Sequence, residues 1–339
     1  MKYYLGIDGG GTKTKFTLAT KDMEVINEYM GSPCHYLQCG YDGLTEIMAK
    51  GVAEVTAGLE SDAAASGSAS PFGEAVFAFA GLAGYGDVIN DAPKIRTAVK
   101  KGLGNMPFEI GNDCENALAG ALGERPGINI IAGTGSVGCG INEAGEYERC
   151  GGWHHALGGD EGSGYWIGWS LIKEFQRQSD GRDEKTALYG AVRNTLNLHT
   201  DDQIVTRVVE EWRLDRAKIA SLAPVCRMLF DAGDPHAKAI FRAAAEELAG
   251  FAISLYKRLG FGKTGAATYD AYNGNAGDYS GNPVPCSGTG GIFKMGDCII
   301  EPFSLMLRSY GMEYAAPLME PDMGAVLLAI KNAGKHDQT

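Results

Sequence analysis

The stretch Asp8-Gly9-Gly10-Gly11-Thr12-Lys13-Thr14 lies between the apolar run Tyr3–Ile7 and the alternating run Lys15–Ala19. The pattern predicts a strand, a glycine turn and a second strand. Consecutive glycines let backbone N–H groups converge without interference from Cβ atoms, and the threonine hydroxyls and Lys13 add further donors. The turn can therefore hold a nucleotide phosphate. An ordinary glycine hairpin is the alternative, because a short glycine motif needs support from its context.

The same order of elements occurs a second time. The apolar run Ile128–Ala132 leads into Gly133-Thr134-Gly135-Ser136 and then into Val137–Ile141. The repeat predicts two halves built on one plan, with a cleft between two domains. A chain of 339 residues is long enough for two cores. We expect an N-terminal domain over 1–115 and a helix-rich C-terminal domain over 116–339, whose last helix packs back on the first domain.

Charge and hydropathy narrow the classes of partner. The 42 acidic residues outnumber the 30 basic ones, which gives a formal net charge of −12. No general basic field is available for nucleic acid or an anionic membrane, so we expect a small-molecule partner. No apolar run approaches about 20 residues, and the start of the chain lacks a charged-then-apolar leader. These features predict a cytoplasmic protein.

The cysteines and histidines give little indication of a metal site. The eight cysteines include no C-x-x-C pair, so we expect buried small hydrophobes rather than a zinc knuckle or a redox dithiol. His154 and His155 are adjacent, and neighbouring side chains on an extended chain point in opposite directions. One of them facing a ligand is the more plausible role.

Strands and helices alternate along the first part of the chain, as a layered α/β fold requires. Asp113 closes one of these strands, where ligands of open α/β sheets are found. The expected elements are a helix carrying Leu44 to Leu59 and ended by Gly58, a loop over Ala63–Gly73, strand Ala75–Ala80, helix Ile95–Leu103, strand Phe108–Asn112 and helix Ala117–Leu122.

The second part is richer in helices. A helix is expected over Tyr165–Gln178, and another over Pro235–Leu259 with Asp234 as its N-cap and Gly260 at C′. An irregular polar insertion over Tyr269–Pro285 precedes the glycine turn Gly288-Thr289-Gly290-Gly291, which is either a further ligand turn or a plain βα loop. A last apolar helix covers Met323–Ile330.

A long composite motif is more specific than any of these turns. Gly151-Gly152-Trp153 is followed by Gly159-Asp160-Glu161-Gly162-Ser163-Gly164-Tyr165-Trp166-Ile167-Gly168. This block is similar to the signature of N-acetylglucosamine kinases. The sequence resembles the acetate and sugar kinase/Hsp70/actin superfamily, in its branch of N-acetylglucosamine kinases and BadF/BadG/BcrA/BcrD ATPases. The resemblance implies a two-domain, actin-like α/β fold, related to ribonuclease H, with an interdomain cleft.

The resemblance implies transfer of the γ-phosphate of ATP to an amino-sugar hydroxyl, the 6-hydroxyl of N-acetylglucosamine first. Asp113 is then the general base, with Glu115 as its competitor and a helix N-cap as the alternative role. Asp8 would lie near Mg²⁺, through water, or would only cap its glycine turn. We also expect the two domains to close over the substrates, and the protein to form a homodimer.

The remaining site residues are carried over from the same resemblance. ATP would be bound by residues of the three glycine turns, and the sugar by residues that include Asp113 itself. The ATP set is Gly10, Gly11, Thr12, Lys13, Thr14, Thr134, Gly135, Ser136, Gly288, Gly290 and Gly291. The sugar set is Cys34, His35, Gly81, Asp113, Gly152, Trp153 and Asp160. For Trp153, a place in the hydrophobic core is the alternative.

Three departures from the family pattern leave the sugar open. Cys34 stands where these kinases have an asparagine, Ala80 followed by Gly81 where they have a serine, and one extra glycine, Gly158 or Gly159, precedes Asp160. Glucosamine, N-acetylmuramic acid or another hexose are therefore alternative substrates, with His35, His154 or His155 supplying polar contacts.

An ATPase activator of a radical dehydratase is the alternative function from another class. It would need thiolates for an iron–sulfur cluster, and no cysteine lies in a recognisable cluster loop. A sugar-sensing regulator would need a DNA-binding segment, and we find none.

Overall fold

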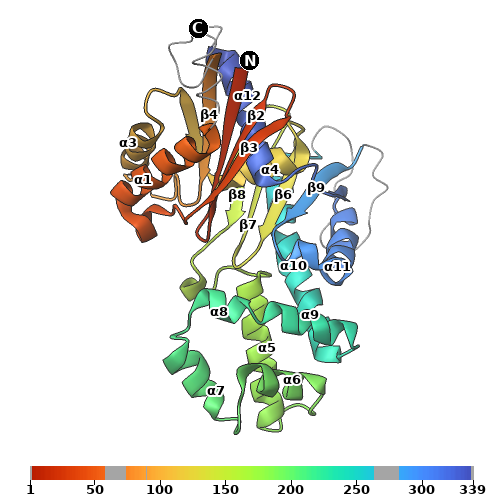
Figure 1. Ribbon diagram of the computed structural model, residues 1–339. Helices are drawn as coiled ribbons and strands as arrows, with labels where there is room; N and C mark the ends of the chain where they lie inside the picture. Colours follow the sequence, from red (N-terminus) through yellow and green to blue (C-terminus); the bar gives the residue numbers. More distant parts are fainter. Residues whose placement is uncertain (1, 58–73, 89, 263–281, 337–339) are drawn as a thin grey trace. The chain divides into compact units, whose positions relative to one another are not determined.

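The computed structural model describes residues 2–57, 74–88, 90–262 and 282–336 (Figure 1). The chain forms two compact units, residues 1–125 with 317–339 and residues 126–316. Each unit contains one mixed five-stranded sheet with helices packed on it. This is the α/β architecture expected from the alternation of strands and helices.

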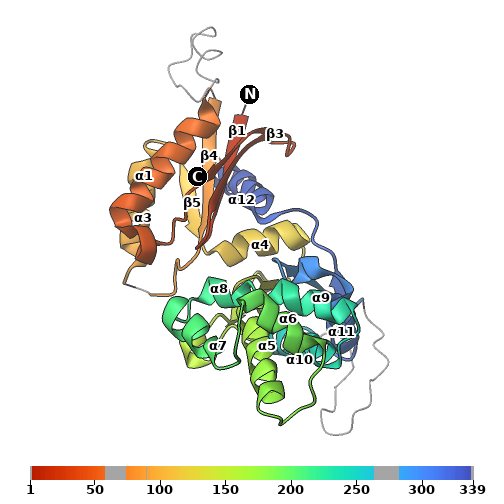
Figure 2. The same ribbon diagram turned by 60° about the horizontal axis from the view of Figure 1, so that its bottom comes forward.

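The sheet of the first unit has the strand order β3-β2-β1-β4-β5. The strands β1, β2 and β3 form an antiparallel meander, and β4 and β5 continue the sheet parallel to β1. Helices α1 and α3 pack together on one face of this sheet, and α4 and α12 on the other (Figure 2). The bounds are β1 (Lys2–Gly9), β2 (Thr14–Thr20), β3 (Val25–Gly31), α1 (Tyr36–Thr56), β4 (Glu74–Leu82), α3 (Ala92–Leu103), β5 (Phe108–Gly111), α4 (Asp113–Leu122) and α12 (Pro321–His336).

The sheet of the second unit repeats this plan. Its order is β10-β9-β6-β7-β8, in which β6, β7 and β8 form an antiparallel meander and β9 and β10 run parallel to β6. The prediction of two halves with one plan is therefore confirmed. The strands are β6 (Gly127–Ala132), β7 (Ser136–Ile141), β8 (Tyr147–Gly151), β9 (Val284–Thr289) and β10 (Met312–Ala315).

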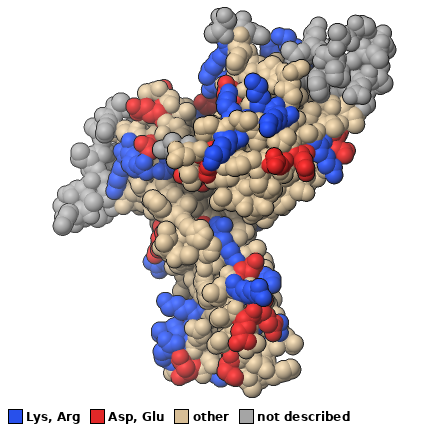
Figure 3. All heavy atoms as spheres, turned by 90° about the vertical axis from the view of Figure 1, so that its left-hand side faces the viewer, with Lys and Arg blue, Asp and Glu red and all other residues tan. Residues whose placement is uncertain are grey.

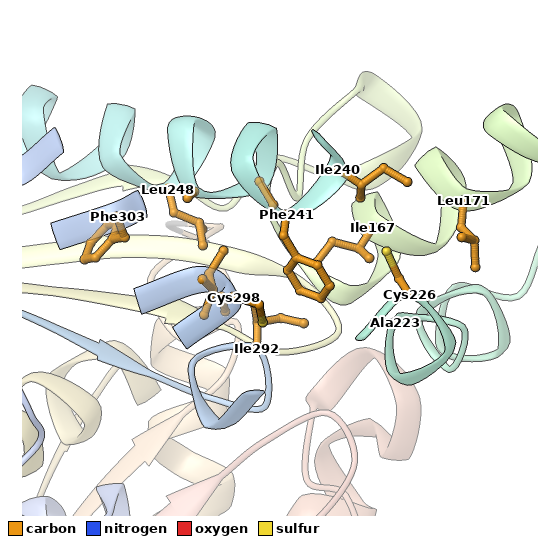
Figure 4. Packing of buried hydrophobic residues seen from close by; sticks show 14 of the residues in the cluster. Ile167, Leu171, Ala223, Cys226, Ile240, Phe241, Leu248, Ile292, Cys298 and Phe303 are labelled. Atoms are coloured by element: carbon orange, nitrogen blue, oxygen red, sulfur yellow. The ribbon is translucent and has the colours of Figure 1, made fainter. Parts of the chain in front are cut away.

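Helices supply most of the core of the second unit. Apolar side chains of α5, α9, α10 and α11 point toward one another, with Phe241 and Phe303 among those that are fully buried (Figure 4). The elements are η1 (His155–Leu157), α5 (Gly164–Ser179), α6 (Ala187–Leu196), α7 (Gln203–Val205), the π-helix η2 (Thr206–Glu211), α8 (Arg216–Ala220), α9 (Ala223–Asp231), α10 (Pro235–Arg258), η3 (Phe293–Met295) and α11 (Asp297–Arg308).

The ends of α10 follow the sequence signals closely. The Asp234 side chain accepts hydrogen bonds from the N–H groups of His236 and Ala237, which satisfies two orphan donors of the first turn. Gly260 follows the helix with φ +69°, a left-handed conformation that glycine adopts without a Cβ clash. Both predicted end signals of this helix are confirmed.

The division of the chain differs from the expected boundary at residue 115. That boundary falls inside α4, which lies wholly in the first unit. The reason is close packing between α4 and α12, where a Cβ atom at Gly324 would lie 2.1 Å from the carbonyl oxygen of Asn116. Helix α12 packs on β1 in the same way, since a Cβ atom at Gly6 would lie 2.5 Å from the carbonyl oxygen of Asp322. The C-terminal helix thus belongs to the first unit.

Several elements have no counterpart among the predictions, namely β3, β8, β10, α6 to α9 and α11. Helix α1 begins at Tyr36, before the predicted apolar stripe, and is kinked at Gly40, where φ is +71°. The predicted helix end at Gly58 and Leu59, the loop over Ala63–Gly73 and most of the Tyr269–Pro285 insertion lie outside the described residues.

The distribution of surface charge and the state of the cysteines match the expectations from composition. On the face drawn in Figure 3, lysine and arginine side chains are intermingled with acidic ones. None of the helices that the structure describes is both long and apolar enough to cross a membrane. All eight cysteines are free thiols, and most are buried, as expected for small hydrophobic side chains.

Candidate functional site

Three parallel strands of the first unit end side by side and bring candidate residues together. Asp8 on β1 is opposite Gly81 on β4, and Gly81 is opposite Gly111 on β5. Asp113 follows Gly111 by two residues. The carboxyl ends of neighbouring parallel strands share one edge of the sheet, where ligands of such sheets are found. The structure thus collects Asp8, Gly81 and Asp113 at one edge.

Asp8 lies in an environment that favours its protonated form. Burial, aided by the negative charges of Asp113 and Asp322, raises the pKa of its carboxyl to about 7, and a hydrogen bond from Asn116 opposes this rise. A carboxylate destabilised in this way gains from a nearby cation. The electrostatics of Asp8 therefore fit a position close to a metal ion.

Asn116 is a site residue that the sequence analysis missed. Its buried amide nitrogen donates to the carbonyl oxygen of Ile7 and to Asp8 Oδ1, each at 3.1 Å. A Cβ atom at Gly81 would lie 2.2 Å from this amide, which explains the glycine there. The only signal in the sequence is spacing, because Asn116 follows Asp113 by three positions and so lies on the same face of α4.

Asp113 is the first residue of α4, and its alternative role as the N-cap is taken by Asn112. The Asn112 side chain accepts from the N–H of Cys114, and Glu115 Oε1 accepts from the N–H of Asn112 at 2.9 Å, which completes a capping box. Glu115, the competing base, is therefore engaged in the cap. Asp113 lies in the first turn of the helix, at the positive end of the helix dipole.

The first glycine turn is closed by a hydrogen bond from the Gly10 N–H to the Lys13 carbonyl oxygen at 2.9 Å. Gly11, Thr12 and Lys13 are exposed and can meet a ligand. Thr14 differs from them, because its buried hydroxyl donates to the Ser32 carbonyl oxygen at 2.7 Å. Of the five residues expected to bind ATP here, Thr14 thus supports the turn from within.

Cys34 lies beside this turn, and His35 is the next residue in the chain. The Cys34 side chain is 2% exposed and packs against Gly9, and burial raises the pKa of its thiol to about 12. It is therefore a neutral group inside the unit. His35 caps α1 by accepting the N–H of Leu37 at its Nδ1, and burial lowers the pKa of its ring.

In the second unit, two glycine turns lie next to each other because β6 and β9 are parallel neighbours. The turn after β6 is held by the first residues of α5, since the Gly164 N–H donates to the Gly133 carbonyl oxygen at 2.8 Å. Gly290 has φ +94°, and a Cβ atom there would lie 2.4 Å from the Ala132 carbonyl oxygen. The predicted residues Thr134 to Ser136 and Gly288 to Gly291 therefore share one sheet edge.

Asp160, a residue of the composite motif, contacts this sheet edge through Ser136. Its Oδ1 accepts from the N–H of Ser136 at 3.2 Å, and its backbone has φ +65°, unusual for a residue other than glycine. Its Oδ2 is buried and forms no hydrogen bond, although Arg216 Nη2 lies 2.7 Å away. Asp160 therefore links the turn at Ser136 to the Arg216 guanidinium, with which its Oδ2 forms an ion pair. Arg216 was not predicted, and its short helix carries no recognisable motif.

The aromatic part of the motif is exposed. Trp153 is 70% exposed, so its alternative role in the hydrophobic core is wrong. Gly152 precedes it with φ +73° and donates its N–H to the Ser136 carbonyl oxygen. His154 accepts the N–H of Ala156, and burial, followed by the neighbouring charge of His154, lowers the pKa of His155. Gly152 thus lies beside the turn Thr134 to Ser136.

A second possible metal position lies elsewhere in this unit. Glu174, Asp183 and His236 bring one ligand atom each within 4.8 Å of one another. Asp183, however, is paired with the Arg177 guanidinium through both of its oxygens. Its charge is already neutralised, so this cluster is less suited to a cation than the surroundings of Asp8.

Comparisons with known proteins identify the family and the fold of this chain. The model of the BadF/BadG/BcrA/BcrD ATPase family matches residues 5–329. The chain is 34% identical over 253 residues to the N-acetylmuramic acid/N-acetylglucosamine kinase of Clostridium acetobutylicum, covering 73% of this chain and 77% of that protein. It is 26% identical to the N-acetyl-D-glucosamine kinase of Dictyostelium discoideum, covering 97% and 98% of the two chains. The crystal structure of a proposed N-acetylglucosamine kinase from Chromobacterium violaceum has a TM-score of 0.68 at 25% identity, covering 97% of this chain and 99% of that one. The expected actin-like kinase fold is confirmed.

Proposed function

Because the chain belongs to the BadF/BadG/BcrA/BcrD ATPase family, we propose that it is an ATP-dependent kinase that phosphorylates an amino sugar. The relatives named as amino-sugar kinases support this reading. The observation that carries it is the position of Asp160, a buried carboxylate that accepts from the Ser136 N–H of the phosphate turn and forms an ion pair with Arg216. A single residue thus connects a nucleotide turn to the composite motif.

The reaction assigns a distinct task to Asp113. A sugar hydroxyl oxygen attacks the γ-phosphorus of ATP, its proton passes to the Asp113 carboxylate, and the bond from phosphorus to the β,γ-bridging oxygen breaks as ADP leaves with the electron pair. Asp113 lies in the first turn of α4, at the positive end of the helix dipole. Glu115 is held by the capping box and does not compete.

The three glycine turns are assigned to ATP. The first turn, Gly10 to Lys13, of which Gly11 to Lys13 are exposed, the turn Thr134 to Ser136 and the turn Gly288 to Gly291 would supply backbone N–H groups and hydroxyls to the phosphates and the adenosine. Mg²⁺ would be held at Asp8, through water, and would neutralise phosphate charge during transfer. The raised pKa of Asp8 fits this assignment, because a cation relieves the cost of its buried charge.

The sugar is assigned to a set of polar and aromatic residues. Asp160 accepts from ring hydroxyls, Gly152 allows close approach of the backbone, and Trp153 offers an exposed ring face. Gly81 and His35 of the first unit complete the set. N-acetylglucosamine is the first candidate and its 6-hydroxyl the acceptor. The buried Cys34, which stands where the kinases have asparagine, keeps glucosamine and N-acetylmuramic acid as alternative sugars.

The test is ADP release from Mg-ATP across a panel of N-acetylglucosamine, glucosamine, N-acetylmuramic acid, N-acetylmannosamine and glucose, with a control that lacks sugar. We expect a sugar-dependent signal that Asp113→Asn lowers about 10²–10⁴-fold, because the amide cannot accept the proton. Glu115→Gln is the matched control and should keep most of the activity. Equal ADP release with and without sugar would overturn the proposal and favour an ATPase activator.

A further inference from the structure

Arg216 lies against both the phosphate turn and the sugar-binding carboxylate of the second unit. Its Nη2 is 2.7 Å from Asp160 Oδ2. A Cβ atom at Gly135 would lie 1.8 Å from the same Nη2, so the guanidinium covers the turn at the point where glycine leaves room. The side chain is nevertheless 40% exposed. Its Nε is buried and forms no hydrogen bond with the residues that the structure describes, so the guanidinium has donor capacity beyond its contact with Asp160, beside the residues assigned to ATP.

The segment before Arg216 has an unusual backbone. A π-helix over Thr206–Glu211 is followed by Arg213 and Leu214, which both have left-handed φ angles, of +53° and +56°. Such conformations are unfavourable for residues with a Cβ atom, and they concentrate at functional sites. Asp215 then caps α8 by accepting the N–H of Lys218. The segment with this unfavourable backbone conformation leads directly into the short helix α8, which carries Arg216.

Helix α8 is held firmly against the helix that supports the phosphate turn. A Cβ atom at Gly168 of α5 would lie 2.1 Å from the Ile219 carbonyl oxygen, and one at Gly164 would lie 3.4 Å from Ala220. Gly164 also donates to the Gly133 carbonyl oxygen of the turn. The turn, the start of α5 and α8 thus form one packed body that fixes the position of Arg216.

Holding Asp160 in place is not a sufficient explanation for the position of Arg216 and the unfavourable backbone before it. Asp160 is already fixed by the Ser136 N–H at its Oδ1 and by the Ser163 N–H at its backbone carbonyl. An ion pair with one well-exposed partner adds little stability, whereas the left-handed residues reduce it. Arginine has a planar, bidentate donor set that matches phosphate oxygens. The geometry is better explained by a ligand with such oxygens.

We propose that Arg216 is a catalytic residue that donates hydrogen bonds to the phosphoryl group as it passes from ATP to the sugar. This inference rests on the proposed kinase function. The transferred group carries charge on its equatorial oxygens while the bond from phosphorus to ADP breaks and the bond to the sugar oxygen forms. A fixed guanidinium lowers the barrier by stabilising that charge, and it gains or loses no proton in the step.

The test compares Arg216→Lys and Arg216→Gln with Lys218→Gln, a matched control on the same helix. With saturating sugar and Mg-ATP, both Arg216 variants should lower kcat about 10²–10³-fold, with KM for the sugar changed less than about threefold. Lysine should not restore the rate, because its ammonium lacks the planar, parallel donors with which a guanidinium matches two phosphate oxygens. Lysine does keep a positive charge beside Asp160, so the melting temperature of the Arg216→Lys protein should stay close to that of the wild type.

A second measurement separates contact with phosphoryl from support of Asp160. ADP with aluminium fluoride mimics the transferred group and should raise the melting temperature of the wild type above the value with ADP alone. Arg216→Lys should lose this additional rise and keep the rise with ADP. The inference would be overturned if the Arg216 variants showed only a higher KM for the sugar with kcat unchanged. It would also be overturned if they lost activity only toward N-acetylmuramic acid, which carries a carboxylate. If the wild type phosphorylates no sugar, the kinase proposal fails, and the fluoride measurement still decides the role of Arg216.

Discussion

Replacing Asp8 by asparagine should stabilise the ligand-free protein at pH 8 while reducing its kinase activity. The wild-type carboxyl has a pKa of about 7, because burial and the nearby Asp113 and Asp322 disfavour its charge. In the unfolded chain the same group titrates near 3.9. The asparagine keeps a side-chain oxygen that can accept the hydrogen bond from Asn116 and carries no charge.

The sign and size of the effect follow from these two pKa values. Between about pH 4 and pH 7 the folded protein holds a proton on Asp8 that the unfolded chain has lost, so the free energy of unfolding falls as pH rises. The loss is complete above pH 7. About three pH units at about 1.4 kcal/mol each give a penalty of up to about 4 kcal/mol for the wild type at pH 8.

Urea unfolding of wild type and Asp8→Asn, followed by circular dichroism in metal-free buffer at pH 4.5 and pH 8, measures this penalty. The variant should be more stable at pH 8 by up to about 4 kcal/mol, and by no more than about 1 kcal/mol at pH 4.5. A difference in stability that is the same at both pH values would refute the reasoning, because it would not arise from the Asp8 charge.

Two further predictions concern packing and the exposed ring. Gly81→Ala should destabilise the protein by about 1–3 kcal/mol, because its new Cβ atom would lie 2.2 Å from the Asn116 amide. Adding Asn116→Ala should recover part of that loss, so denaturant unfolding of the singles and the double should give a non-additive cycle. Trp153→Ala should leave stability within about 0.5 kcal/mol, because the side chain is 70% exposed. The same change should raise KM for the sugar about three- to tenfold in the ADP-release assay, since an apolar ring face is lost.

The parts of the fold that were predicted are those with strong local signals. The runs on either side of Asp8 to Thr14 became β1 and β2, and those around Gly133 to Ser136 became β6 and β7. Asp234 and Gly260 marked the ends of α10, because capping depends on the chemistry of single residues. The edge strand β3 was missed because it alternates between exposed and half-buried positions, which gives no apolar run. Helices α7 and α8 have five residues or fewer, too short for a helical stripe.

The candidate site was predicted in part, for a related reason. Asp113, Asp160 and the glycine turns stand in motifs that can be read along the chain. Asn116 and Arg216 act through contacts with residues far away in the sequence, so no local pattern identifies them. The capping role of Asn112 illustrates the limit, because the choice between Asn112 and Asp113 depends on where the helix begins, and helix ends are uncertain from sequence.

The repeated plan of the two units also shows where their chemistry differs. Each unit places a glycine turn between the first two strands of its sheet, and the residue before that turn is Asp8 in one unit and Ala132 in the other. Ala132 is fully buried, so a carboxylate in its place would be removed from solvent. Two acidic turns facing phosphates would also add repulsion. Under the proposed function, this asymmetry assigns the cation to the turn of Asp8, whereas the other turn would neutralise phosphate through backbone donors and, by our inference, Arg216.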